Sequence, residues 1–189
     1  MGRPRLVPDR AFPAYAYLPG RHPHPVRDPA GHSYQIQPVH VVARVGSEEF
    51  SWGADLFNHG YYWEAHEAWE GLWQVADKSS EIRSLLKGLI LLSAAGVKIR
   101  EGKRPAAGRH AGRAAVLFRC LGKVQQDDFE RGLGLRLKML ADYAAVTAAA
   151  PRILLGTHGG QPEPVFEFIL GREFTPTKPL GAGRSAQGI

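Results

Sequence analysis

The chain has 189 residues, a hydrophobic fraction of 44% and a single cysteine, Cys120. This length suits one hydrophobic core and is short for two. No stretch is long and apolar enough to cross a membrane, and the N-terminus lacks the apolar segment of a secretory signal. Because one cysteine cannot form an internal disulfide, we expect a cytoplasmic protein that does not enter a membrane.

The formal net charge is +6 at pH 7. A basic chain can bind nucleic acid, but here the Lys and Arg residues are spread along the sequence and no nucleic-acid-binding motif accompanies them. We therefore interpret the excess positive charge as solvated surface and do not expect a nucleic-acid partner.

The first 46 residues differ from the rest of the chain. They hold eight of the 14 prolines and four of the eight histidines. Proline fixes φ and is excluded from helix interiors, so this segment is predicted to be an extended arm. It also carries Tyr15, Tyr17 and Tyr34, and a solvated linker rarely needs so many aromatic side chains. We expect the arm to lie across the folded domain and to bury these tyrosines.

Helix signals follow the arm in regular order. Ser47 is an N-cap residue followed by two acids, Pro105 suits a first helical turn, and Gly60 and Gly102 favour helix ends. Apolar residues recur at helical spacing, and the alternation typical of strands is nearly absent. The predicted helices are 48–57, 61–75, 81–100, 105–121 and 133–150.

The third predicted helix is apolar on almost every side, so we expect it to be the central buried helix. The fold class predicted is all-α, a bundle of about five helices with the N-terminal arm packed over it. The predicted division is an arm at 1–46, a helical domain at 47–155 and a mostly irregular tail at 156–189. Within the tail, the apolar patch 165–170 is a candidate to pack back on the bundle.

The second predicted helix carries the most distinctive side chains. Each helical residue turns about 100° around the axis. This rotation places Tyr62, His66, Trp69 and Trp73 on one face, with Glu70 beside His66 one turn on. Glu67 points about 100° away from His66.

His66 and Glu70, at positions i and i+4, can ligate one metal ion. Glu67 directly follows His66, as the general base does in His-Glu-x-x-His metalloproteases. A catalytic metal needs a third protein ligand, for which His24 and His32 of the arm are candidates. Zinc is the metal that this mixture of histidine and carboxylate favours.

A structural interpretation of the same residues stays open. A histidine beside a glutamate on an aromatic helix face is often a buried hydrogen-bonded pair, and tryptophans at helical spacing are often core. Lys87, inside the apolar third helix, is expected to pair with a glutamate of the second helix or to extend to solvent.

One run of the sequence resembles a known family. It reads Phe57-Asn58-x-Gly60-x-Tyr62-Trp63-Glu64-Ala65-His66-Glu67-x-x-Glu70-x-x-Trp73. The run is similar to the signature of the domain-of-unknown-function family 309, small helical proteins labelled as metal-dependent hydrolases. The resemblance extends over roughly residues 13–122, and the arm looks like an N-terminal extension carried by one branch of the family. Leu91 and Lys98 depart from the family, where members often have Gln and some have His.

Two functions follow as expectations. The first is a metal-dependent hydrolase in which His66, Glu70 and an arm histidine hold zinc, and Glu67 or Glu64 activates water. The second is a non-catalytic module whose aromatic groove binds a peptide or small molecule, with the chain forming a homodimer. The pocket residues expected in either case are Tyr62, Trp69, Trp73, Lys87 and His110.

Overall fold

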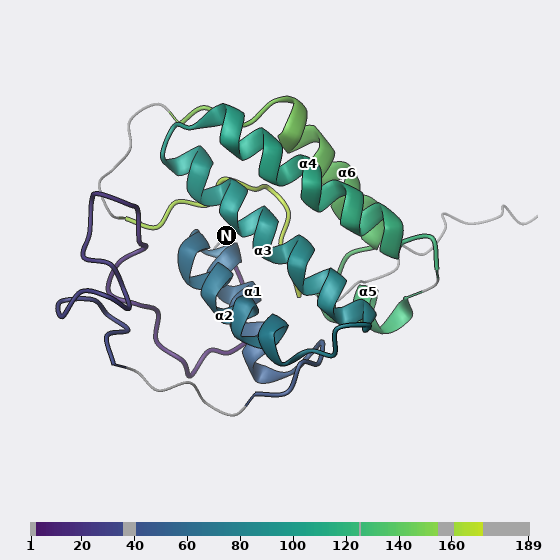
Figure 1. Ribbon diagram of the computed structural model, residues 1–189, viewed down its shortest axis with the longest axis horizontal. Helices are drawn as coiled ribbons and strands as arrows, with labels where there is room; N and C mark the ends of the chain where they lie inside the picture. The colour runs from purple at the N-terminus through teal and green to yellow at the C-terminus, as the bar shows by residue number, and fades with distance from the viewer. Residues whose placement is uncertain (1–2, 36–40, 125, 155–160, 172–189) are drawn as a thin grey trace, which may run out of the picture.

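The computed structural model describes residues 3–35, 41–124, 126–154 and 161–171, and this part of the chain consists of helices and irregular segments without a strand (Figure 1). The all-α prediction is therefore confirmed. The helices are α1 (Glu48–Asn58), α2 (Tyr62–Val75), α3 (Glu81–Arg100), α4 (Arg104–Leu121), α5 (Asp127–Leu133) and α6 (Leu137–Ala149). None of these helices is both long and apolar enough to cross a lipid bilayer.

Local sequence accounts for most helix boundaries. The side chain of Ser47 accepts a hydrogen bond from the backbone N–H of Phe50 and so caps α1. Pro105 lies in the first turn of α4, where its missing N–H costs nothing. Gly60 has φ of 88°, a left-handed value that lets the chain turn from α1 into α2.

Helix α3 lies at the centre of the bundle, as its composition predicts. It packs against α2 on one side and α4 on the other, α1 packs on α2, and α6 packs on α4. Gly88 and Gly96 allow close approach, because an added Cβ would lie 2.4 Å from the ring of Phe118 and 2.6 Å from the ring of Tyr62. This close packing explains why the interior of α3 contains two residues of low helix propensity.

The prediction of one helix at 133–150 was wrong at its beginning. The chain forms a short α5, turns at Gly134 with φ of 64°, and begins α6 at Leu137. The carboxylate of Glu130 accepts a hydrogen bond from the N–H of Leu137, which has no helical partner at the start of α6. The sequence analysis did not predict α5, which Gly134 in its left-handed conformation separates from α6.

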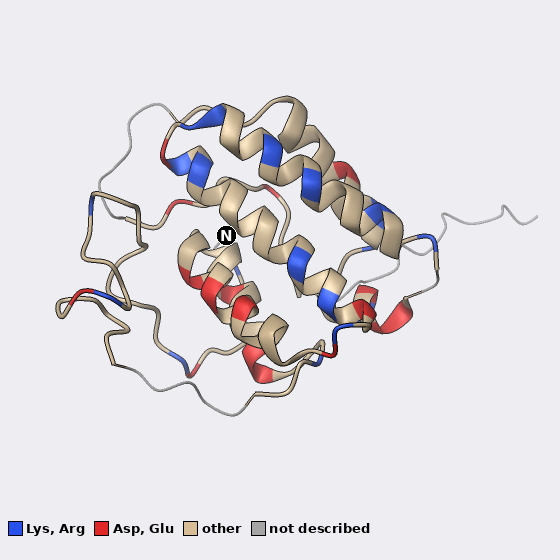
Figure 2. Ribbon diagram, in the orientation of Figure 1, with Lys and Arg blue, Asp and Glu red and all other residues tan. Residues whose placement is uncertain are grey.

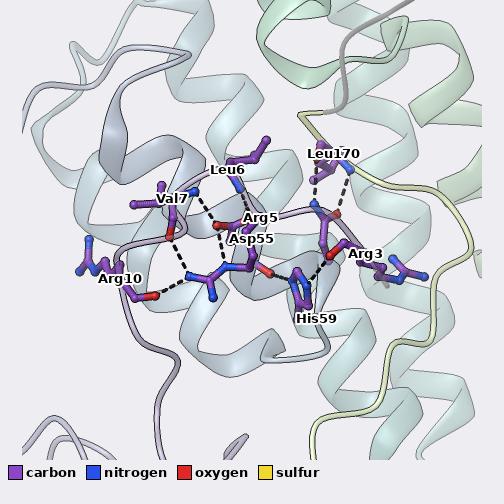
Figure 3. A network of polar contacts seen from close by, with 9 residues as sticks. Arg3, Arg5, Leu6, Val7, Arg10, Asp55, His59 and Leu170 are labelled. Carbon is purple, nitrogen blue, oxygen red and sulfur yellow. Dashed lines mark hydrogen bonds and ion pairs between the residues drawn. The ribbon is translucent and has the colours of Figure 1, made fainter. Parts of the chain in front are cut away.

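The beginning of the arm is fixed to α1 through the buried carboxylate of Asp55 (Figure 3). One oxygen accepts a hydrogen bond from the N–H of Leu6 at 2.8 Å, and the other accepts from the N–H of Val7 at 2.8 Å and from Arg5 Nε at 3.2 Å. Both carboxylate oxygens are therefore satisfied by the arm. Close by, His59 Nε2 hydrogen-bonds to the carbonyl oxygen of Arg3 at 3.2 Å.

The later part of the arm covers α2. Tyr17 and Leu18 are buried, Tyr15 is half-buried, and Tyr34 is 38% exposed. The expected burial of Tyr34 was thus wrong. Residues 36–40 lie outside the described residues.

The apolar patch in the tail is part of the core. Within the described segment 161–171, which has no helix, Phe166 stacks on Phe57 with ring centroids 5.0 Å apart, and Phe168 stacks on Tyr143 of α6 at 4.9 Å. Asn58 anchors the segment, since its side chain donates to the carbonyl oxygen of Leu170 and accepts from its N–H, both at 2.9 Å. This segment joins α1 and α2 to α6 across the bundle (Figure 1).

Candidate metal centre

Helix α2 carries three possible metal ligands near one another. A nitrogen of His66 and carboxylate oxygens of Glu67 and Glu70 all lie within 4.8 Å of one another. His66 Nε2 is 3.6 Å from Glu70 Oε2, close to the roughly 3.4 Å edge of a tetrahedron with metal–ligand distances of about 2.1 Å. Small side-chain rotations would bring all three donors onto one ion, because glutamate side chains on the surface of a helix turn readily.

The structure brings a third possible metal ligand close to His66 and Glu70, although the rotation between helical residues predicted that this side chain would point elsewhere. Glu67 lies about 100° from His66 around the helix, yet its carboxylate reaches the other two groups. The reason is the length of the glutamate side chain and its i, i+3 relation to Glu70, which brings the two residues onto neighbouring ridges.

The protonation states of these groups suit a cation. Burial lowers the pKa of His66 below its usual 6.5, a larger influence than the neighbouring Glu70 carboxylate, which raises it. His66 is therefore neutral near pH 7, the form that ligates metals. Burial, followed by repulsion from Glu70 and Glu64, raises the pKa of Glu67, and Arg27 lowers it by less.

The arm histidines do not join these three residues. His32 Nε2 lies 3.1 Å from Glu64 Oε1, and its Nδ1 is 2.8 Å from the hydroxyl of Ser33. The ring of His24 packs edge-on against Trp63, with centroids 5.5 Å apart, and its Nδ1 accepts weak hydrogen bonds from backbone N–H groups of residues 26 and 27. His24 and His32 thus shape the arm around α2 and do not belong to the group formed by His66, Glu67 and Glu70.

The aromatic residues expected to line a groove have different environments. Tyr62 and Trp69 are fully buried, and the Tyr62 hydroxyl accepts a hydrogen bond from the N–H of Val165, while burial raises its pKa to about 12. Trp73 is half-buried, with the guanidinium of Arg83 3.9 Å and the ammonium of Lys87 4.9 Å from its ring centroid. Tyr62 and Trp69 therefore belong to the core and do not form an aromatic groove with Trp73.

Lys87 lies on α3, which packs on α2, and His110 lies on α4, which packs on the other side of α3. Within the described residues Lys87 forms no ion pair with a glutamate of α2, and its charge is one of the influences that lower the pKa of His66. His110, on α4, has a pKa lowered first by burial and then by Lys98 and other cations nearby. Figure 2 shows the wider pattern, with acidic residues along α2 and basic residues along α3 and α4.

A cavity of about 210 Å³ lies between the arm, α1 and α2. Glu64 forms part of its wall and holds the arm, since its Oε1 accepts a hydrogen bond from the N–H of Tyr17 at 2.9 Å and contacts His32. Glu67 also lines the cavity, so one residue belongs to both the candidate metal centre and the cavity. Sequence reasoning missed the wall residues Arg10, Glu49 and Trp52, because no local pattern shows that the arm and α1 meet at this place.

Comparison with known families agrees with the motif on α2. The family model described as Domain of unknown function (DUF309) matches residues 50–109, which run from α1 through α2 and α3 into α4. This part of the chain belongs to the DUF309 family. The resemblance expected from the sequence is thereby confirmed for these residues, and the arm lies outside the match. No curated protein and no solved structure matches the chain.

The structure separates the DUF309 motif into two kinds of residue. Asn58 holds the tail segment, Gly60 forms the turn and Tyr62 fills the core, so these positions serve the fold. The other positions carry polar atoms that are not needed for the packing of the core. They are Glu64, His66, Glu67 and Glu70. The second group is where a function of the domain is to be sought.

Proposed function

We propose that this DUF309 protein is a divalent-metal-dependent hydrolase whose metal ligands are His66, Glu67 and Glu70. The observation that carries the proposal is the gathering of one histidine nitrogen and two carboxylates within 4.8 Å on α2. A set of one nitrogen and two carboxylate donors suits zinc, and three protein ligands leave a position for water. A bound divalent ion would act as a Lewis acid and would lower the pKa of that water, so that a nucleophile is available near neutral pH.

The chain's own residues have distinct tasks in this proposal. His66, held neutral by burial, donates a nitrogen lone pair, and the two glutamates neutralise the ion's charge. Glu64, on the next turn toward the N-terminus of α2, accepts a proton as general base. Its support is the buried Oε2, which has no hydrogen-bond partner among the described protein atoms.

Metal binding is the first test. Isothermal titration of the full chain with Zn²⁺, after treatment with a chelator, is expected to give about one site with micromolar or tighter affinity. His66→Gln, Glu67→Gln and Glu70→Gln should each weaken binding by at least about tenfold, since each removes one of three ligands. His110→Gln is the matched control, because His110 is a half-buried histidine outside the ligand set. Absence of binding by the wild-type chain at micromolar metal would refute the proposal.

Hydrolysis is the second test. Zinc-loaded protein should cleave a member of a panel of simple esters, phosphoesters and amides. Glu64→Gln should lower kcat and leave zinc affinity within about twofold, because Glu64 is not a ligand and the proposed general base contributes roughly 10²-fold or more. Zinc binding without any cleavage would favour the non-catalytic alternative, in which the same site and cavity bind a small molecule or peptide.

A homodimer in the cytoplasm remains part of the proposal. Its support is the exposure of apolar residues on and after α6, since Tyr143, Val146 and Ile153 have exposed fractions of 38, 67 and 60%. Light scattering on the purified chain measures the assembly directly. A monomer at micromolar concentration would remove this part without affecting the metal centre.

A further inference from the structure

The cavity between the arm, α1 and α2 is assembled from three separate segments. Arg10, Pro25 and His32 come from the arm, Glu49 and Trp52 from α1, and Trp63, Glu64, Glu67 and Ala68 are among the wall residues of α2. Its volume is about 210 Å³, and it is partly open to solvent. This space is too large for a metal ion and below the usual size of a pocket for drug-like ligands, so it suits a molecule of a few non-hydrogen atoms.

Two buried polar atoms of the wall residues have no hydrogen-bond partner in the described part of the chain. They are the acceptor Glu64 Oε2 and the donor Trp63 Nε1. The side chain of Glu64 is only 6% exposed, and its other oxygen is already used by Tyr17 and His32. A buried polar group without a partner costs free energy, and native proteins keep such groups where a ligand or water completes them.

The charges at the wall point to the kind of ligand. Arg10 pairs with Glu49 at 2.9 Å, so these two charges cancel. The remaining carboxylates of the wall are Glu64, which contacts His32, and Glu67. The cavity therefore has an excess of negative charge in a partly enclosed place, which a cation would compensate.

We infer that this cavity binds a small primary ammonium compound that also carries a hydrogen-bond acceptor, such as a short amino alcohol. The ammonium donates to Glu64 Oε2, and the hydroxyl oxygen accepts from Trp63 Nε1. Both buried atoms then have a partner, and the ammonium compensates the excess negative charge. The site does not depend on a metal at His66, and it adds a ligand class that the proposed hydrolase activity does not specify.

A matched series of four-carbon compounds tests the inference. The full chain, kept in excess chelator, is titrated with 4-aminobutan-1-ol, butylamine, butane-1,4-diol and 4-hydroxybutyrate, with binding followed by calorimetry and by tryptophan fluorescence. We expect the amino alcohol to bind at least about tenfold more tightly than the diol, because hydrogen bonds to a charged group are the stronger ones. Butylamine should lie between them, and the carboxylate should not bind.

Variants assign the contacts. Glu64→Gln should lower the affinity for the amino alcohol by at least about tenfold, while the amide keeps an oxygen for Tyr17 and His32. Trp63→Phe should lower the affinity for the amino alcohol to that for butylamine, and it should leave the affinity for butylamine unchanged. Asp142→Asn is the matched control, since it removes one carboxylate charge from an exposed pair on α6 and should leave all affinities unchanged.

Several outcomes would overturn the inference. The first is that neither amine binds at millimolar concentration, which would mean that water alone fills the cavity. The second is that the diol binds as tightly as the amino alcohol. The third is that Glu64→Gln leaves the affinity for the amino alcohol unchanged. Nα-acetyl-lysine amide distinguishes a free small amine from a lysine side chain of another protein. Its ammonium chain has no terminal hydroxyl for Trp63 Nε1, so it should bind no more tightly than butylamine, and binding as tight as that of the amino alcohol would overturn the assignment to a small free amine. Because chelator is present throughout, these results are independent of the zinc titrations.

Discussion

The arm meets the helices at two buried carboxylates, and the two contacts differ. Asp55 of α1 is fully buried, and both its oxygens accept hydrogen bonds from residues 5–7. Glu64 of α2 is nearly as buried, and one oxygen holds the arm through Tyr17 and His32. Its second oxygen has no partner among the described protein atoms and belongs to a residue that lines a cavity.

The difference shows how a fold uses the same chemical group in two ways. A buried carboxylate with a complete set of donors stabilises the structure and has nothing left to offer a ligand. A buried carboxylate that is only half satisfied gives less stability and keeps an acceptor available. Burial alone therefore does not reveal whether a carboxylate serves folding or function, whereas the count of its hydrogen bonds does.

The largest effect expected is that of Asp55→Asn. The substitution keeps the size but turns one acceptor into a donor that faces the N–H groups of Leu6 and Val7 and the guanidinium of Arg5. Breaking such a buried charged network costs about 3–5 kcal/mol, and urea unfolding should show a decrease of this size in the free energy of unfolding. Trypsin should also cleave the variant faster at Arg10. A decrease below about 1 kcal/mol would show that the arm is not fixed at Asp55.

The same chemical change at the second carboxylate should have a smaller effect. Glu64→Gln keeps an oxygen for the N–H of Tyr17 and for His32, and it places the new amide where no partner was present. The free energy of unfolding should fall by about 1 kcal/mol or less, the value of a typical hydrogen bond. Equal losses in the two variants would remove the contrast between Asp55 and Glu64.

Stability at low pH should depend on His66. Because burial holds the pKa of His66 below its usual 6.5, the unfolded chain binds the proton more readily than the folded one. The contribution of His66 to stability is complete above about pH 6.5 and decreases as the pH falls toward the lowered value. His66→Gln should remove part of this decrease in unfolding curves between pH 7.5 and 5. A wild-type advantage that grows as the pH falls would instead indicate a raised pKa and a structural ion pair.

The smallest effect expected is that of Glu70→Gln in metal-free protein. The contact with His66 is 3.6 Å long, the Glu70 side chain is 37% exposed, and His66 is neutral near pH 7. Exposed pairs at i, i+4 contribute little, so the free energy of unfolding should change by less than about 0.5 kcal/mol. With zinc present, the same variant should lose most of the stabilisation that the metal gives to the wild type. A large loss without metal would identify the pair as structural.

The sequence by itself determined the first four helices, the central place of α3 and the position of the DUF309 motif on α2. These features depend on local chemistry, such as the cap at Ser47, the proline in the first turn of α4 and apolar spacing along the chain. The i, i+4 relation of His66 and Glu70 is also local, since helix geometry alone places them side by side.

Only the tertiary structure decided which partners those residues receive. Sequence reasoning assigned the third metal ligand to the arm, but the packing of the arm brings His32 to Glu64 and leaves Glu67 beside His66. It also moved Tyr62 and Trp69 into the core and built the cavity from the arm, α1 and α2. Such contacts join residues tens of positions apart, and helical periodicity fixes the face of a side chain without specifying which distant segment will cover it.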